Sequence, residues 1–402
     1  MTETFTEFPA PRAAGCPFAP PPALREAAAE KPLSRVRLWD GSNPWLITGH
    51  AEQRAILSDT RVSMDEKRPG FPHQNAATAE NVQHHPQTIF NTDAPEHTRF
   101  RRLMTFPFTA KRVEALRPVI QQITGDLIDE MLAGPKPADL VQALALPLPT
   151  LMICELLGIP YEDHDLFQRN ATVAVDRNAT AEEGARASGE LMGYLARLIT
   201  TRLETPGEGW VAELAERVKA GEIDVTGAAQ LGVVLLIAGH ETSANMIALG
   251  TLALLQHPDQ FDVFRSGDDP KVVAGAVEEM LRYLSIAHHG LRRIATDDIE
   301  IGGQTIRAGE GIIVPLPVAN WDGDVFPDPE RLDLHRQARQ HHAFGFGIHQ
   351  CVGQQLARVE LQVVYSTLCK RIPTLALAAD AGSLEFKDDY LAYGVRELSV
   401  SW

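Results

Sequence analysis

The feature that most constrains the fold is an apolar stretch of about thirty residues in the second half of the chain. Asp224–Thr226 can cap the start of a helix here, and His257-Pro258 would end it. At 1.5 Å per residue such a helix spans about 45 Å, enough to cross a whole globular protein. Because the stretch is apolar nearly all round, the helix should be buried. The sequence therefore predicts a protein built around one long internal helix.

The rest of the chain is also predicted to be mainly helical. Apolar residues at helical spacing occur in 111–133, 180–204, 226–256, 270–284 and 353–371. Strand-like segments are fewer, namely Arg35–Leu38, Trp45–Ile47, Ile299–Ile313 and the C-terminal tail. No flexible linker divides the chain. We expect one mainly α domain, 1–402, with small β-sheets, an α-rich lobe and a small β-rich lobe, in which residues 1–22 form a proline-rich N-terminal segment.

Composition narrows the class of protein. The chain has 37 Lys+Arg against 53 Asp+Glu, and its net charge of −16 argues against nucleic-acid binding. The four cysteines have no paired spacing, so we expect no disulfide framework and a reducing compartment. The N-terminus lacks the basic start and apolar run of a targeting segment, and no uninterrupted apolar run predicts a membrane span. A soluble, cytoplasmic protein is expected.

The middle of the predicted long helix carries residues that are costly in a buried helix. Residues 238–243, AGHETS, bring a glycine, an acid and two hydroxyls into an apolar surrounding. The Thr242 hydroxyl can bond the Ala238 carbonyl, and a local break would open the helix toward a cofactor. The alternative interpretation is a packing notch between helices.

A single cysteine lies in a glycine-rich loop just ahead of a helical pattern. The segment HHAFGFGIHQCVGQQLARVEL, residues 341–361, contains it as Cys351. Glycines let the backbone approach a flat ligand closely, and a nearby helix N-terminus lowers the pKa of a thiol. The loop therefore predicts a thiolate that can ligate iron. A cysteine considered in isolation would more often be buried and inert.

Four motifs together resemble the cytochrome P-450 haem-thiolate family. They are Phe344-Gly345-x-Gly347-x-His349-x-Cys351-x-Gly353, Ala238-Gly239-x-Glu241-Thr242, Glu279-x-x-Arg282 and PEHTRFRR at 95–102. The sequence looks most like soluble actinobacterial members, especially a subfamily associated with secondary-metabolite tailoring and xenobiotic oxidation. The resemblance implies a monomer with the cytochrome P-450 fold, which has a long central helix over the haem and a cysteine-ligand loop.

The resemblance assigns roles around the haem. Cys351 would be the axial iron ligand, Phe344 would pack near its sulfur, and Gly345 and Gly347 would permit the loop. Ala238 and Gly239 would lie beside the haem on the central helix.

The resemblance also implies a structural ion network for folding and haem retention. Glu279 and Arg282 are three residues apart, so one helix face can pair them, and Arg331 would be their third partner.

The two haem propionates need cations. His97 and Arg101 are four residues apart, so one helical face can present both. Arg293 and His349 match the family's other propionate contacts. The guanidinium group suits carboxylates because it can donate two parallel hydrogen bonds.

The resemblance implies a monooxygenase that inserts one oxygen atom from O2 into a C–H bond. Haem b (iron protoporphyrin IX) would supply the chemistry. Thr242 would hold the distal oxygen, and Glu241 or solvent would supply protons. Electrons would come from NAD(P)H through ferredoxin reductase and ferredoxin, and a basic patch near Cys351 would dock an acidic ferredoxin.

Two other classes of function stay open. One is a haem-thiolate enzyme with different chemistry, such as peroxygenation, dehydration or oxidative coupling. The other is a non-enzymatic haem sensor or ligand carrier. The intact Glu241-Thr242 pair, which is expected to deliver protons, disfavours both.

Substrate-facing positions can be placed only through the resemblance. The candidates are Ile89, Leu235, Ile286, His288 and Tyr393. They are mostly apolar, which predicts a hydrophobic small molecule of moderate size. Core packing is an equally good interpretation for the apolar members of this set.

Overall fold

The computed structural model describes residues 6–13, 15–84, 87–175, 180–205, 207–388, 390 and 392–402. Residues 1–5 and 14 of the predicted N-terminal segment lie outside these ranges. The chain divides into two compact units. Unit 1 comprises Met1–Arg102, Gly267–Gln354 and Phe386–Tyr393, and unit 2 comprises Leu103–Ser266, Gln355–Glu385 and Gly394–Trp402.

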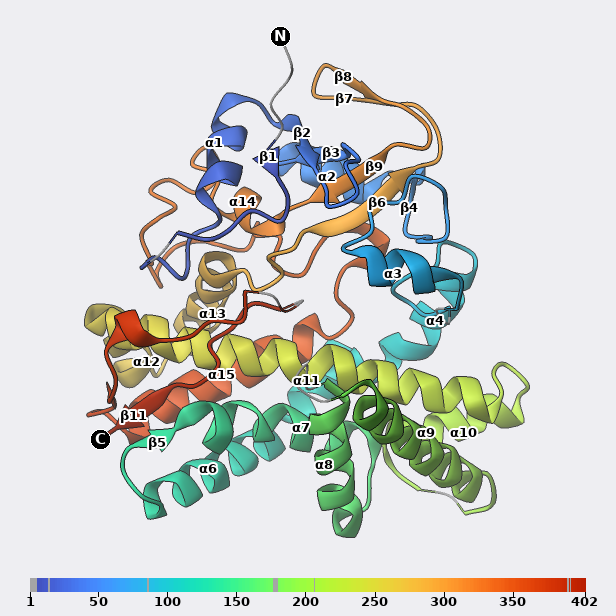
Figure 1. Ribbon diagram of the computed structural model, residues 1–402. Helices are drawn as coiled ribbons and strands as arrows, with labels where there is room; N and C mark the ends of the chain where they lie inside the picture. Colours follow the sequence, from blue (N-terminus) through green and yellow to red (C-terminus); the bar gives the residue numbers. More distant parts are fainter. Residues whose placement is uncertain are drawn as a thin grey trace. The chain divides into compact units, whose positions relative to one another are not determined.

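Unit 1 contains a six-stranded sheet (Figure 1). Its strands in spatial order are β1 (Thr6–Glu7), β2 (Leu33–Arg37), β3 (Trp45–Ile47), β9 (Gly311–Val314), β6 (Leu291–Ala295) and β4 (Val62–Ser63). The β1–β2 and β3–β9 pairs are parallel, and the other pairs are antiparallel. β7 (Ile299–Ile301) and β8 (Gln304–Ile306) form a separate antiparallel pair. Ile47, Ile306 and Ile312 are buried in the core beside the sheet.

Most of the predicted site residues of unit 1 lie on its helices or next to them. These elements are α1 (Pro22–Glu30), α2 (His50–Ser58), α3 (Ala76–Asn81), the 3-10 turn η1 (Val82–His84), α4 (Glu96–Thr105, which continues into unit 2), α13 (Pro270–Leu284), α14 (Leu316–Asn320) and the 3-10 turn η5 (Gly347–His349). α13 has the bounds that the sequence predicts. The Asp269 carboxylate accepts from the Lys271 amide at 2.8 Å, and Pro270 begins the helix.

Unit 2 is mainly helical. Its helices and turns are η2 (Phe106–Phe108), α5 (Ala110–Ala115), α6 (Arg117–Ala133), the π-helical turn η3 (Val141–Ala145), α7 (Pro147–Leu157), η4 (Tyr161–Asp163), α8 (His164–Val175), α9 (Ala181–Glu204), α10 (Gly209–Lys219), α11 (Val225–Gln256), α12 (Pro258–Ser266), α15 (Gln354–Arg371) and η6 (Ala381–Ser383). A small antiparallel sheet has the order β10 (Ala376–Leu377), β11 (Ser399–Ser401), β5 (Ala138–Asp139). The predicted helix over 111–133 is two helices, because Pro118 favours a new helix start over continuation.

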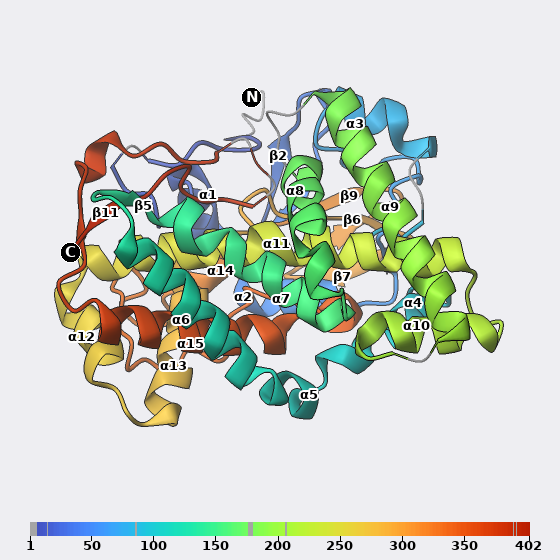
Figure 2. The same ribbon diagram turned by 90° about the horizontal axis from the view of Figure 1, so that it is seen from below.

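α11 is the long internal helix that the sequence predicts (Figures 1 and 2). It has 32 residues, the Asp224 carboxylate caps it by accepting from the Gly227 amide at 2.7 Å, and it ends just before His257-Pro258. α7, α9 and α10 pack against it and lie below it in Figure 1. α11 is long and apolar enough to cross a membrane, but 72% of its most apolar window is buried inside the protein. Burial in the core therefore accounts for its composition.

Candidate functional site

The Cys351 loop lies in unit 1, between η5 and α15. Gly345 and Gly347 have φ angles of +70° and +74°, which residues with a Cβ rarely adopt. A Cβ on Gly347 would also collide with the backbone oxygen of Leu57, so only glycine fits there. The Cys351 amide donates to the Phe344 carbonyl at 2.9 Å and closes the loop. The loop therefore presents an exposed thiol from a backbone of fixed shape.

The four residues expected to contact the propionates come together in unit 1. His97 and Arg101 lie one turn apart on α4, Arg293 lies on β6, and His349 lies in η5. The ring centroids of His97 and His349 are 4.0 Å apart. Arg101 Nη1 donates to the Gln350 carbonyl at 2.5 Å, which ties α4 to the cysteine loop. The structure thus brings α4, β6 and the cysteine loop together. We call these four residues the basic cluster.

Burial makes positive charge costly in the basic cluster. Burial lowers the pKa of Arg293 to about 10. Burial, together with the charges of His97 and Arg293, lowers the pKa of His349 to about 3. The pKa of His97 is lowered first by burial and then by the charge of Arg101. Each of these shifts would be relieved by an anion at the cluster.

The donor chemistry of the basic cluster fits the two propionates of a haem. The Nε2 atom of His97 is buried and has no hydrogen-bond partner among the described residues. A propionate oxygen would accept from this nitrogen and from the guanidinium group of Arg293.

The predicted ion network is present in α13, with one change of partner. Arg282 Nε and Nη2 donate to Glu279 at 2.7 and 2.9 Å, and both side chains are fully buried. The third partner is Arg336, whose Nε donates to Glu279 Oε1 at 3.1 Å, and the prediction of Arg331 was wrong. Arg331 is exposed, because the turn in which its amide donates to the Asp328 carbonyl directs its side chain away from the core. Its backbone carbonyl accepts from Arg336 Nη2 at 3.2 Å.

The central motif of α11 lies in unit 2. Thr242 Oγ1 donates to the Ala238 carbonyl at 2.7 Å, as the sequence predicts. The expected local break is absent, since α11 remains α-helical from 238 to 243. The hydroxyl bonds the carbonyl of its own helix, which satisfies it without opening the helix.

Two neighbours of the Thr242 motif have polar partners that the sequence does not reveal. His240 Nδ1 lies 2.6 Å from Thr150 Oγ1 on α7. Ser243 Oγ donates to Glu360 Oε2 on α15 at 2.9 Å. Burial raises the pKa of Glu360 to about 7, although the hydrogen bond from Ser243 opposes the shift. These contacts hold two sides of α11 against neighbouring helices, which leaves Glu241 and Thr242 on another side.

Three of the candidate substrate-facing residues lie together in unit 1. The Tyr393 amide donates to the Ile286 carbonyl at 2.9 Å, and the His288 and Tyr393 rings are 5.3 Å apart. The Arg12 guanidinium lies 3.9 Å from the centre of the Tyr393 ring, a contact that the sequence did not predict. Ile89, also in unit 1, and Leu235, on α11, are both buried. Their contact with a substrate stays a prediction.

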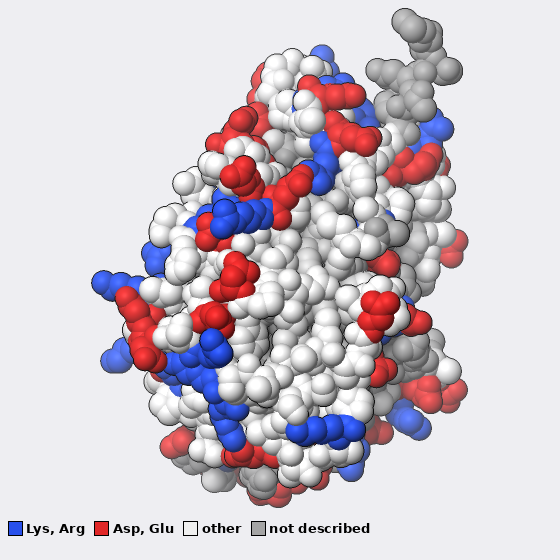
Figure 3. All heavy atoms as spheres, turned by 90° about the vertical axis from the view of Figure 1, so that its left-hand side faces the viewer, with Lys and Arg blue, Asp and Glu red and all other residues white. Residues whose placement is uncertain are grey.

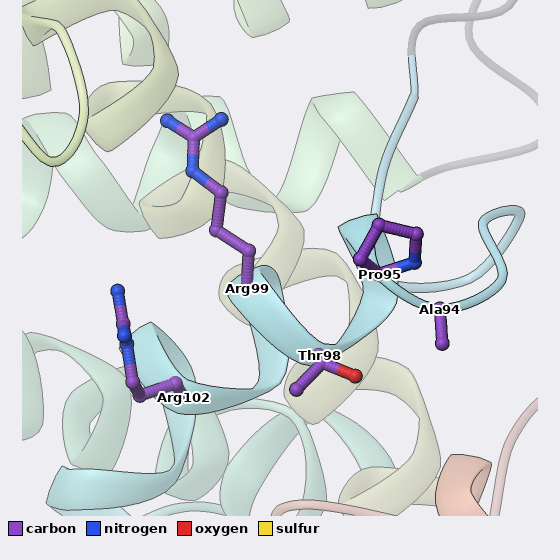
Figure 4. Close-up of a pocket in the computed structure, with 5 residues that line it drawn as sticks. All are labelled: Ala94, Pro95, Thr98, Arg99 and Arg102. Atoms are coloured by element: carbon purple, nitrogen blue, oxygen red, sulfur yellow. The ribbon is translucent and has the colours of Figure 1, made fainter.

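α4 also presents two arginines beside an open hollow. Ala94, Pro95, Thr98, Arg99 and Arg102 line this hollow of about 700 Å³ (Figure 4). Arg99 and Arg102 are three residues apart and extend to the same side of the helix. On the face drawn in Figure 3, by contrast, acidic and basic side chains lie next to one another.

Several known proteins are similar to this chain in sequence and in fold. The family model of Cytochrome P450 matches residues 270–372. Cytochrome P450 CYP105Q4 from Mycobacterium marinum is 59% identical, covering 98% of this chain and 96% of that protein. The crystal structure of GfsF, a cytochrome P450 of Streptomyces halstedii, matches with a TM-score of 0.94 at 55% identity, covering 99% of this chain and 100% of that chain. The 20-oxo-5-O-mycaminosyltylactone 23-monooxygenase of Streptomyces fradiae is 42% identical, covering 98% of this chain and 92% of that protein.

These similarities confirm the predicted fold, which is mainly α with small β-sheets, and the predicted haem-thiolate class. They extend over nearly the whole chain and therefore include both α11 and the cysteine loop. The chain belongs to the cytochrome P450 family, as a monooxygenase of the CYP105 subfamily.

Proposed function

We propose that this cytochrome P450 monooxygenase inserts one oxygen atom of O2 into a C–H bond of a hydrophobic small molecule, with electrons from NAD(P)H through ferredoxin reductase and ferredoxin. The observation that carries the proposal is the pairing of a thiol and a basic cluster in unit 1. The Cys351 thiol lies in a glycine-shaped loop, and Arg101 on α4 bonds the backbone of that loop. An iron porphyrin with two carboxylates needs both kinds of group.

Haem b would supply the oxygen chemistry when bound, and a thiolate ligand would push electron density onto its iron, which favours O–O cleavage. Cys351 would hold its iron. His97, Arg101, Arg293 and His349 would hold its propionates, which would offset the cost of burying these cations.

Proton delivery is assigned to α11 in this proposal. Thr242 Oγ1 donates to the Ala238 carbonyl and can exchange that bond for one to an ordered water. Glu241 is partly exposed and would resupply the proton. Ala238 is partly exposed and would lie beside the haem. A Cβ on Gly239 would meet the Ile153 side chain on α7 at 3.2 Å, so this glycine lets α7 pack closely against α11.

The substrate class is proposed from the residues and from one relative. Ile286 and Tyr393 are joined by a backbone hydrogen bond, and Ile89 and Leu235 are buried apolar residues. Such side chains suit an apolar ligand. The monooxygenase of Streptomyces fradiae that acts on 20-oxo-5-O-mycaminosyltylactone supports a secondary metabolite as the substrate.

The electron donor is proposed from charge. Residues 91–120 carry six Lys+Arg against three acids, in a chain with a net charge of −16. Arg99 and Arg102 present part of this excess on one side of α4 (Figure 4). An acidic ferredoxin would be attracted to such a surface, mainly through a faster encounter. Reduction by ferredoxin should therefore slow as salt is raised, and rates that do not depend on salt would contradict this docking surface.

The carbon monoxide spectrum of the reduced protein tests the haem-thiolate assignment. Dithionite and CO should shift the Soret band to the red position typical of thiolate ligation. Cys351→Ala should lose this band, because no other side chain in the loop supplies a thiolate. If the variant kept the spectrum, the proposed iron ligand would be wrong.

Electron supply separates the proposed function from its alternatives. Product formation that requires NADPH, reductase and ferredoxin supports a monooxygenase. Turnover with hydrogen peroxide alone would favour a peroxygenase, and CO binding without any turnover would favour a sensor or carrier. A single monomeric domain in the cytoplasm, without nucleic-acid or membrane partners, remains part of the proposal.

A further inference from the structure

Two elements of unit 1 share the basic cluster. α4 presents His97 and Arg101, and β6 presents Arg293. β6 pairs with β4, so that Ser63 lies opposite Ile294. Whatever joins α4 to β4 therefore fixes the spacing between the two groups of cations.

Asp93 makes this connection. Its Oδ2 accepts from the Ser63 hydroxyl, and its Oδ1 accepts from the Met64 amide at 2.8 Å. Its backbone carbonyl accepts from the His97 amide at 2.8 Å. Ser63 is only 1% exposed, so solvent competes little for these bonds. One residue thus bonds the end of β4 with its carboxylate and the first turn of α4 with its backbone.

The charge of Asp93 acts on the same cluster. It favours the protonated forms of His97, Arg293 and His349, against the effect of burial on their pKa values. A propionate is also an anion, so the charge of Asp93 by itself would weaken propionate binding. The charge and the position of Asp93 therefore have opposite expected effects on haem retention, and an experiment can separate them.

We propose that Asp93, through its bond to Ser63, is a positioning residue that holds α4 on β4 and so sets the spacing of the cations that bind the haem propionates. This inference rests on the proposed function, because it requires that the basic cluster binds haem. In this inference Asp93 is not one of the propionate-binding residues. It acts through the placement of His97 on one element and Arg293 on the other.

The test compares haem loss from the holoprotein and from three variants, with excess apomyoglobin as the haem acceptor. Asp93→Ala removes both carboxylate bonds, Ser63→Ala removes one of them and keeps the charge, and Asp93→Asn keeps the shape and removes the charge. Asp139→Ala is the matched control, since Asp139 Oδ1 also joins two segments by accepting from the Val141 and Leu398 amides at 3.0 Å, but in unit 2. Hydrogen exchange of the α4 amides in each holoprotein is the second measurement.

A positioning role predicts about tenfold faster haem loss for Asp93→Ala, which corresponds to about 1.4 kcal/mol. Ser63→Ala should lose haem severalfold faster, and Asp139→Ala should match the wild type. Asp93→Asn should lose haem no faster than the wild type, because it keeps the position of the side chain and removes the charge that repels a propionate. Hydrogen exchange of the amides in the first turn of α4 should be faster in Asp93→Ala and in Ser63→Ala than in the wild type.

Two results would overturn the inference. Slower haem loss in Asp93→Asn and Asp93→Ala, with no change in Ser63→Ala, would mean that Asp93 acts by charge alone. Unchanged haem loss and unchanged α4 exchange in all variants would mean that it does not position the cluster. If the wild type shows the thiolate CO spectrum in either case, the proposed function still holds. A wild type without that spectrum would overturn the function and this inference together.

Discussion

The buried carboxyl of Glu360 predicts how the stability of the protein depends on pH. Glu360 lies on α15, is 3% exposed, and has Ser243 Oγ as a hydrogen-bond donor at 2.9 Å. Burial raises its pKa from 4.5 to about 7, because a charged carboxylate is poorly solvated inside the protein. The change to make is Glu360→Gln, which keeps the shape of the side chain and is neutral at every pH.

The sign follows from proton binding. Between pH 4.5 and 7 the folded state keeps the proton of Glu360, whereas the unfolded state has released it. The contribution to stability is therefore complete below pH 4.5 and is lost as the pH rises through 7. Each pKa unit corresponds to about 1.4 kcal/mol, so the carboxyl loses about 3 kcal/mol of folding free energy over this range. Between pH 4.5 and pH 8, the unfolding free energy of Glu360→Gln should therefore rise by about 3 kcal/mol relative to that of the wild type.

Urea unfolding of the holoprotein at pH 5 and pH 8 measures the effect. The quantity of interest is the difference in unfolding free energy between the wild type and Glu360→Gln at each pH, since other titrating groups cancel in it. Glu130→Gln, on the exposed surface of α6, serves as the control. A difference between wild type and Glu360→Gln that is the same at both pH values would refute the reasoning from burial.

Two further predictions concern the ion network and α11. Arg336→Leu should destabilise the protein by about 1.5–3 kcal/mol, because Glu279 loses a charged donor, whereas Arg331→Leu on the surface should change stability by less than about 0.5 kcal/mol. Urea unfolding checks both, and equal losses would show that Arg331 does belong to the network. Thr242→Ala should keep haem and the CO spectrum but form severalfold less product per NADPH and more peroxide, because the hydroxyl that relays protons is gone. Unchanged coupling, from paired product and peroxide assays, would remove Thr242 from proton delivery.

Features that depend on neighbouring residues were predictable from the sequence. The start of α11 follows from the Asp224 carboxylate and its end from Pro258, because caps and prolines act within one turn. The Glu279–Arg282 pair follows from a spacing of three residues on a helix. The shape of the Cys351 loop follows from Gly345 and Gly347, which adopt positive φ angles that other residues avoid.

Features that depend on distant residues appeared only in the folded chain. Arg331 and Arg336 both lie near Pro329 in sequence, and the turn at Asp328 decides which of them faces Glu279. α11 runs without a break, although its composition suggested one, because Thr242 bonds within its own helix.

The hydrogen-bond partners of Ser243 and Asp93 also lie far away in the sequence. Ser243 and Glu360 are 117 positions apart, and Ser63 and Asp93 are 30 apart. The amino-acid sequence by itself determined the ends of α11 and α13, the shape of the cysteine loop and the family, since short-range spacing encodes them. Only the tertiary structure decided which buried polar groups meet, because burial and side-chain direction depend on how distant segments pack.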